Sequence, residues 1–173
     1  SDAQAFAYLL GGHPMYEISF PTPGKSWLYD GFSKVWNELQ DTNGGRHWAQ
    51  KFANFQNKLL VSDYRNGNIY RLDNTNFTDN GANTAMEIWS KHIWNDDKYI
   101  GIQQIQIDME QGVGLVSGQG VNPQMELQVS RDGGNTFESV GFSSIGPIGE
   151  YRHRVMWDSL GSARDWVLKL RVT

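Results

Sequence analysis

The sequence has 173 residues, of which 39% are hydrophobic and 13% aromatic, which is enough apolar material for one domain or two small ones and argues against disorder. Its net charge of −4, without a basic block, argues against a specific nucleic-acid binder, and the absence of cysteine excludes a disulfide scaffold and cysteine-based metal or redox chemistry. No stretch approaches the roughly 20 apolar residues of a membrane span. The aromatic excess favours strands over helices.

The first half of the chain consists of short runs of alternating polar and apolar residues, separated by turn residues. Residues 15–20, for example, place Tyr16, Ile18 and Phe20 on one face of a strand and Glu17 on the other. This pattern predicts antiparallel hairpins. The expected strands are residues 5–10, 15–20, 26–29, 34–39, 48–55, 59–63 and 68–73.

Residues 59–73 carry the strongest hairpin signal. An apolar run ends at Asp63, an alternating run begins at Asn68, and the turn between them contains Asn66 and Gly67. An Asn-Gly pair between two strands favours a type I′ turn because both residues tolerate positive φ. The sequence therefore predicts a tight turn at Asn66 and Gly67.

Two passes of the chain, spaced at roughly the 40 residues of a propeller blade, resemble each other. In each pass a strand runs to an aspartate, a glycine-containing turn follows, and the next strand carries aromatic and aliphatic residues. We therefore expect residues 1–82 to form partial β-propeller-like hairpin repeats. Two blades are too few to close a ring, so the missing blades are expected upstream of Ser1 and the chain is interpreted as a fragment of a longer protein.

The composition shifts to Asn, Thr, Asp and Gly over residues 74–83, which indicates a module boundary. Beyond it, residues 99–109 alternate isoleucine with glutamine, as a strand with one buried face does. Five or six strands with turns between them predict an antiparallel β-sandwich over residues 83–173. The expected strands are residues 84–94, 99–109, 125–130, 137–142, 152–157 and 166–172.

Residues 130–137 read Ser-Arg-Asp-Gly-Gly-Asn-Thr-Phe and match the Asp-box. In this turn an aspartate accepts backbone N–H bonds, glycine supplies positive φ and the aromatic ring packs beneath. The motif occurs in sialidase propellers away from the catalytic pocket, so it predicts a turn and not an activity. The turn residues predicted for the whole chain are Asn66, Gly67, Ser130, Asp132, Gly134, Thr136 and Phe137.

No catalytic residue, cofactor or metal is expected. A glycosidase needs two facing carboxylates, and a sialidase also needs three clustered arginines and a tyrosine, which this sequence does not group together. Residues 73–81 alternate oxygen-bearing side chains but lack the glutamate of an EF-hand loop, so a solvated loop is favoured over a calcium site. The four histidines lack the spacing of zinc ligands. The carboxylates considered are Asp30, Asp63, Asp73, Asp79, Asp108, Glu110 and Asp132.

Further motifs follow one another over nearly the whole chain. They are His13-Pro14-Met15-Tyr16, Trp27-Leu28-Tyr29-Asp30, Gly67-Asn68-Ile69-Tyr70-Arg71-Leu72-Asp73, Gln111-Gly112-Val113-Gly114, Ser130-Arg131-Asp132-Gly133-Gly134 and Arg154-Val155-Met156-Trp157. Their residues and order resemble the packaged-DNA stabilisation proteins of short-tailed bacteriophages, which are accessory or hub proteins of the tail.

The resemblance implies a non-enzymatic structural protein of the virion tail, present as a homo-oligomer and assembled in the host cytoplasm. Such a protein would attach below the portal, help to close and stabilise the packaged DNA, and dock other tail proteins. A carbohydrate-binding or glycoside-processing β-propeller module is the alternative, because the Asp-box is accompanied by seven tryptophans that could stack on sugars. Coplanar exposed tryptophans, or a carboxylate pair in a cleft, would favour that alternative.

Overall fold

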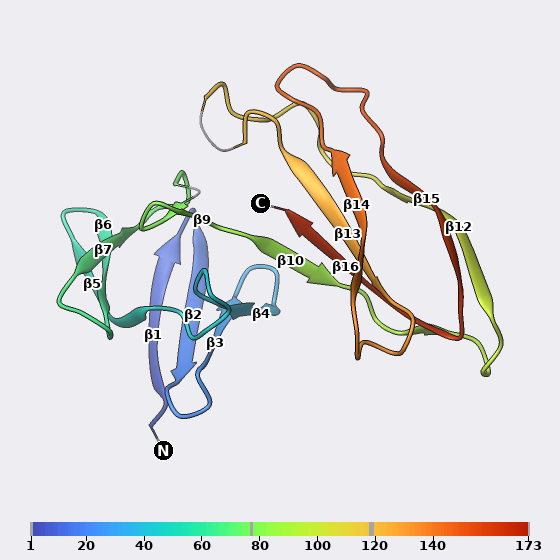
Figure 1. The fold of residues 1–173 in the computed structure, drawn as a ribbon. Helices are drawn as coiled ribbons and strands as arrows, with labels where there is room; N and C mark the ends of the chain where they lie inside the picture. The colour runs from blue at the N-terminus through green and yellow to red at the C-terminus, as the bar shows by residue number, and fades with distance from the viewer. Residues whose placement is uncertain (1, 77, 118–119, 173) are drawn as a thin grey trace. The chain divides into compact units, whose positions relative to one another are not determined.

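The computed structural model describes residues 2–76, 78–117 and 120–172, and the regular secondary structure in these ranges is β-strand (Figure 1). The expected all-β class is therefore confirmed. The chain divides into two compact units, Ser1–Ala82 and Asn83–Thr173, and each is described by itself.

The first sheet of the first unit is a four-stranded antiparallel meander in the order β1-β2-β3-β4. Its first hairpin closes with a two-residue turn in which Gly11 and Gly12 have φ of 59° and 86°, a conformation that suits glycine. The register places Tyr29 opposite both Tyr16 and Trp36. The strands are β1 (Gln4–Leu10), β2 (His13–Phe20), β3 (Lys25–Asp30) and β4 (Val35–Leu39).

A three-stranded antiparallel sheet in the order β5-β6-β7 packs against the first sheet. The Phe52 ring lies 5.9 Å from the Phe6 ring and 5.7 Å from the Tyr8 ring. The β5–β6 hairpin has a two-residue turn in which Gln56 and Asn57 have φ of 49° and 58°, as a type I′ turn requires. The remaining strands of this part are β5 (Ala49–Phe55), β6 (Lys58–Asp63), β7 (Ile69–Leu72) and the short pair β8 (Thr78–Asp79) and β9 (Ala82–Asn83).

The polar face of β2 is the buried one. Glu17 and Ser19 are 0% and 2% exposed, whereas Tyr16 on the opposite face is 39% exposed. The Ser19 and Ser26 hydroxyls lie 2.7 Å apart, and His47 contacts one oxygen of the Glu17 carboxylate, so each of these buried side chains has at least one polar partner. The alternation in the sequence correctly separates the two faces, but tertiary partners decide which face is covered.

The four-stranded and three-stranded sheets of the first unit are antiparallel meanders, which is the strand order of propeller blades. A blade is defined by its place in a closed ring of sheets. The assignment of propeller-like repeats therefore remains a prediction.

The second unit is a β-sandwich of two antiparallel sheets (Figure 1). The larger sheet has the order β10-β16-β13-β14, with β11 also paired to β16, and the smaller sheet pairs β12 with β15. The run 84–94, expected as one strand, is split into β10 and β11. At the split, the Ser90 N–H donates to the Leu168 carbonyl, and the Ser90 hydroxyl accepts the Leu168 N–H. The strands are β10 (Met86–Trp89), β11 (Ile93–Trp94), β12 (Ile100–Ile107), β13 (Gln124–Ser130), β14 (Glu138–Ser144), β15 (Val155–Ala163) and β16 (Asp165–Val172).

The sandwich core is built from alternate residues of the central strands. Leu127 and Val129 of β13 are 0% and 1% exposed. Trp166 is completely buried, and its indole N–H donates to the Ile100 carbonyl at 2.9 Å, so the polar atom of the ring is paired. The buried cluster consists of Met125, Leu127, Val129, Ile145, Val155, Trp157, Leu160, Ala163 and Trp166.

A β-bulge lies at the irregular step in the isoleucine spacing of β12. The sequence steps by two from Ile100 to Ile102, by three to Ile105, and by two again to Ile107. The pairing with β15 shifts register just after Ile102, where the step from Ile102 to Gln104 faces a longer step in β15, and Ser159 in β15 has a φ of 59°. The isoleucines on both sides of this shift pack on the core.

Candidate functional site

The Asp-box residues meet in the turn between β13 and β14. The Asp132 carboxylate accepts the N–H groups of Asn135 at 3.0 Å and Thr136 at 2.9 Å, together with the Thr136 hydroxyl at 2.7 Å. The Ser130 hydroxyl donates to Asp132 at 2.6 Å and accepts the Gly134 N–H at 2.8 Å. Gly134 has a φ of 90°, which favours glycine. Both oxygens of the carboxylate are thus engaged inside the turn.

These hydrogen bonds also determine the protonation state of the turn. The Ser130 hydroxyl, followed by the backbone and side chain of Thr136, holds the pKa of Asp132 at about 2, below its ordinary value of 3.8. Such a carboxylate is ionised at neutral pH and cannot act there as a general acid. The geometry is that of a structural turn.

Phe137, the last residue of the motif, contacts an aromatic residue of another strand. Its ring centroid lies 4.9 Å from that of Trp89 in β10, and the Lys169 ammonium of β16 lies 4.9 Å from Phe137 and 5.3 Å from Trp89. Trp89 remains 55% exposed. The cation–π contacts connect the Asp-box turn to β16 and the edge strand β10.

The type I′ turn predicted at Asn66 and Gly67 is wrong. Neither residue has positive φ, and the loop 64–68 between β6 and β7 is longer than two residues. Instead, the Asp63 carboxylate accepts the Arg65 N–H at 2.8 Å and the Asn66 amide at 3.0 Å. The Asn66 side-chain oxygen in turn accepts the Asn68 N–H at 2.8 Å. These side-chain hydrogen bonds shape the loop, so positive φ is not needed.

Asp30, one of the carboxylates considered for catalysis, also serves a turn. It accepts the Phe32 N–H at 2.8 Å and the Ser33 hydroxyl at 2.9 Å, and it lies 3.0 Å from the His13 ring nitrogen. The bond with His13, followed by that with Phe32, holds the pKa of Asp30 at about 2. The Asp30 carboxylate therefore stabilises the turn after β3 and its contact with His13 of β2.

The loop 73–81, considered for calcium, forms local hydrogen bonds where it is described. The Asp73 carboxylate accepts the N–H and hydroxyl of Thr75, and the Asn76 side chain does the same for Thr78. Phe77 lies outside the described residues. Within the described ranges, no group of three or more His, Cys, Asp or Glu side chains is arranged to hold a metal ion.

A buried ion pair in the first unit was not found by sequence reasoning. The Glu17 carboxylate is fully buried, and one oxygen lies 2.7 Å from Nδ1 of His47, while the other has no hydrogen-bond partner among the described residues. Burial acts to lower the pKa of His47, but the hydrogen bond and charge of Glu17 outweigh it and raise that pKa above 6.5. Burial and the same charge raise the pKa of Tyr8. Only the packing of the segment before β5 against β2 reveals this pair, because residues 17 and 47 belong to no local motif.

Arg65, also in the first unit, connects three loop and strand segments. The Arg65 guanidinium lies 3.1 Å from Asp63, 3.6 Å from Asp41 and 3.9 Å from the ring centroid of Trp48. The Trp48 indole N–H donates to Asp41 at 3.3 Å. These contacts hold the segment before β5 against the turn after β6, which is a structural role.

The tryptophans divide between core and surface. Trp48, Trp157 and Trp166 are buried, whereas four others are between 38% and 63% exposed. Core packing therefore accounts for three of the seven tryptophans. The exposed ones are Trp27, Trp36, Trp89 and Trp94.

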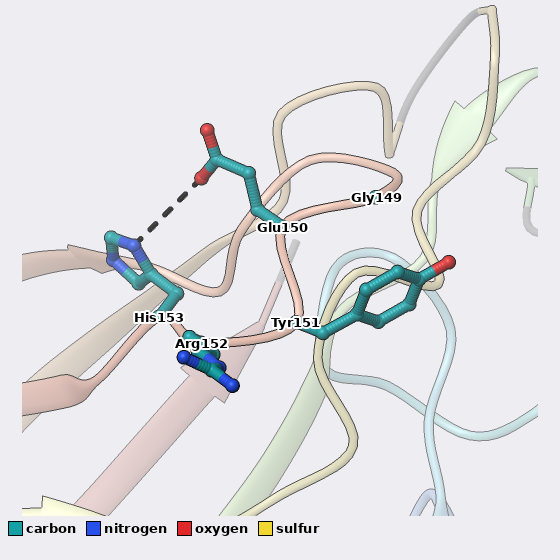
Figure 2. Close-up of a pocket in the computed structure, with 5 residues that line it drawn as sticks. All are labelled: Gly149, Glu150, Tyr151, Arg152 and His153. Atoms are coloured by element: carbon teal, nitrogen blue, oxygen red, sulfur yellow. Dashed lines mark ion pairs between the residues drawn. The ribbon is translucent and has the colours of Figure 1, made fainter.

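A surface cavity of about 430 Å³ is lined by one loop of the second unit, residues 149–153 (Figure 2). Glu150 and His153 approach each other to 3.9 Å on one side of the loop, while the Tyr151 ring points to the other side (Figure 2). Tyr151 is 70% exposed. The lining side chains do not converge on one point, so the loop lacks the arrangement of a catalytic site.

The fold and these sites together define a class of protein. The polar constellations in both units stabilise turns and join strands, and the described residues include no helix long and apolar enough to cross a bilayer. The chain is an all-β protein with a sandwich domain.

A comparison with known protein families identifies the family of this chain. The family model described as the β-sandwich of bacteriophage P22 Gp10 matches residues 85–173, just over half of the chain. The chain belongs to this family. It is thereby a structural component of a phage tail, located in the virion and in contact with other virion proteins. No curated protein matches the chain.

Proposed function

We propose that this protein is a non-enzymatic tail component that attaches below the portal, helps to close and stabilise the packaged DNA, and docks other tail proteins. It is assembled in the host cytoplasm and is present in the virion in several copies. The observation that carries the proposal is the match of residues 85–173 to the P22 Gp10 β-sandwich family. The first unit contributes propeller-like repeats in this proposal.

The chemistry of the sites supports a structural function. The Asp132 carboxylate is used within its own turn, and that of Asp30 is used by its turn and by His13 of β2; the low pKa of each keeps it ionised. The Glu17 carboxylate is completely buried beneath His47, whose side chain is 19% exposed, so a substrate would not reach this carboxylate. The negative net charge of the chain favours protein contacts over direct contact with DNA.

The test is the mass of the complex formed when the chain is mixed with purified portal rings of its phage. We expect a complex of fixed stoichiometry by native mass spectrometry, with ring-shaped particles extended at one end. An unrelated ring-shaped protein of similar diameter is the matched control and should bind nothing. Absence of a complex with portal rings, together with binding on a glycan array, would refute the proposal and favour a carbohydrate-binding module.

A further inference from the structure

The chain contains three Asn-Gly pairs, Asn43-Gly44, Asn66-Gly67 and Asn80-Gly81. Asparagine is chemically labile, and it is most labile before glycine, because no Cβ hinders the approach of the glycine nitrogen to the asparagine side chain. The three pairs consist of the same two residues but lie in different surroundings. A large difference in their reactivity in the folded chain would therefore come from the structure.

The Asn66 side-chain amide is held at both ends. Its nitrogen, Nδ2, donates to the Asp63 carboxylate at 3.0 Å, and its oxygen, Oδ1, accepts the Asn68 N–H at 2.8 Å. These partners assign the orientation of the amide, because an ionised carboxylate only accepts and an N–H only donates. Asp63 is ionised at neutral pH: burial acts to raise its pKa, but the hydrogen bonds from Arg65 outweigh burial and lower that pKa.

The bond from Asn68 places a donor where attack on the Asn66 side chain develops negative charge. When the Gly67 nitrogen adds to Cγ of Asn66, Oδ1 becomes an oxyanion, and the Asn68 N–H already points at that oxygen. The same bond closes a small ring that contains both Cγ and the Gly67 nitrogen, so it keeps the two reacting atoms together. Within the described ranges, the Gly67 N–H donates no hydrogen bond that attack would have to break.

The other two pairs lack this arrangement. Among the described residues, the side-chain amides of Asn43 and Asn80 form no hydrogen bond, so no donor is placed at either side-chain oxygen. The nucleophile of the first pair is also engaged, since the Gly44 N–H donates to the Asp41 carbonyl at 3.0 Å. Asn80 and Gly81 form the turn between β8 and β9, with φ of 49° and 83°. These two pairs are internal references for Asn66.

We propose that Asn66 is the site at which this chain deamidates and isomerises without an enzyme. The Gly67 nitrogen gives its proton to a solvent base and forms a bond to Cγ of Asn66. The bond from Cγ to Nδ2 breaks, and that nitrogen takes a proton from water and leaves as ammonia, which produces a cyclic succinimide. Water then adds to one of the two ring carbonyls and opens the ring, either to aspartate or to isoaspartate, in which the main chain runs through the former side chain.

The product changes the loop between β6 and β7, because Asp63 loses a donor and gains a like charge. The amide nitrogen that donates to Asp63 at 3.0 Å is replaced by a carboxylate oxygen. Two carboxylates repel each other at this distance, so the contact is lost. Since Asp63 also accepts the Arg65 N–H at 2.8 Å, the disturbance extends to the rest of the loop. Deamidation is therefore expected to loosen this loop as the protein ages.

Peptide mapping by mass spectrometry tests the proposal. The folded chain is incubated in mildly alkaline buffer made with heavy-oxygen water, which labels each newly deamidated residue. We expect Asn66 to deamidate on the order of tenfold faster than Asn43 and Asn80, a modest effect for one oxyanion donor. The chain unfolded in urea is the matched control, and there the three pairs should react at similar rates.

Two substitutions separate the reaction from its consequence. Gly67→Ala should slow deamidation of Asn66 on the order of tenfold and leave the other two pairs unchanged, because the added Cβ hinders attack while nothing lies within 4 Å of its position among the described residues. Asn66→Asp mimics the product and should speed hydrogen exchange in peptides that cover the loop between β6 and β7. Asn43→Asp, the same change at an asparagine whose amide has no described partner, should leave that exchange unchanged.

Equal rates at the three pairs of the folded chain, or a faster rate at Asn43 or Asn80, would overturn the proposal. A lead of Asn66 that persists in urea would also overturn it, because the local sequence would then be the cause. Exchange in Asn66→Asp that matches the wild type would refute the loss of the Asp63 contact as the consequence of the reaction.

Discussion

Removal of the His47 side chain is expected to destabilise the first unit strongly. Glu17 is completely buried, and His47, at 2.7 Å, is the hydrogen-bond partner of its carboxylate. His47→Ala leaves that carboxylate buried without its partner. Breaking a buried pair in this way costs about 3–5 kcal/mol, because the remaining charge is neither solvated nor paired.

His13→Ala is the matched control. It also removes a histidine 3.0 Å from a carboxylate, that of Asp30, but the His13 side chain is 40% exposed and water can replace it. We expect its cost to stay below about 1 kcal/mol. Urea denaturation followed by hydrogen exchange on peptides from β2 and β5 measures the first unit separately from the second. A loss for His47→Ala no larger than that for His13→Ala would refute the burial argument.

The Glu17–His47 pair should also make the free energy of unfolding of the first unit depend on pH. The pKa of His47 in the folded chain is raised above its ordinary value of 6.5. Its contribution to stability is therefore fully present below pH 6.5 and is lost as the pH rises through the folded pKa. The free energy of unfolding of the first unit should fall on the alkaline side, and His47→Gln should flatten that fall.

Two further predictions concern turns. The pKa of Asp132 is about 2 in the folded chain, against an ordinary value of 3.8, so its contribution to stability is present above pH 3.8 and is lost as the pH falls toward 2. Calorimetry should show that Asp132→Ala lowers the melting temperature at pH 7. The variant should also lose less of its melting temperature on acidification than the wild type does. A melting temperature unchanged at pH 7 would contradict this role. Gly67→Val should change the unfolding free energy by less than about 0.5 kcal/mol, since Gly67 lacks positive φ and no atom of the described residues lies within 4 Å of its Cβ position. Asn57→Val should lower the free energy of unfolding by about 1–2 kcal/mol, because it forces a β-branched residue into a φ of 58°. Equal effects of the two valine substitutions in chemical denaturation would contradict the turn assignment.

Local patterns predict the strands well because they report on the pleat of a single strand. The β1–β4 hairpins, the β13 alternation and the strand over residues 100–107 all follow from period-two patterning. The step of three between Ile102 and Ile105 is visible in the sequence, and the structure places a bulge of the partner strand β15 beside it. The split at Ser90 was not predictable, since it depends on a hydrogen bond with Leu168 on a distant strand.

Turns were predicted unevenly for a physical reason. The Asp-box contains its own hydrogen-bond partners within residues 130–136, so its sequence is sufficient to identify the residues that meet there. The Asn66-Gly67 pair permits a type I′ turn but does not require one. Asp63 accepts the Arg65 N–H and selects a longer loop, and the positive-φ turn forms instead at Gln56 and Asn57.

The sequence alone determined that this protein is all-β, that its strands form antiparallel hairpins, and that Asp132 lies in a turn motif, because each depends on residues close together in the chain. Only the tertiary structure decided which face of β2 is buried. Glu17 looks like a solvent-facing residue until His47 is brought beside it, and Tyr16 looks like a core residue until its face is found uncovered. Burial belongs to the packing of sheets on one another, and no single strand encodes it.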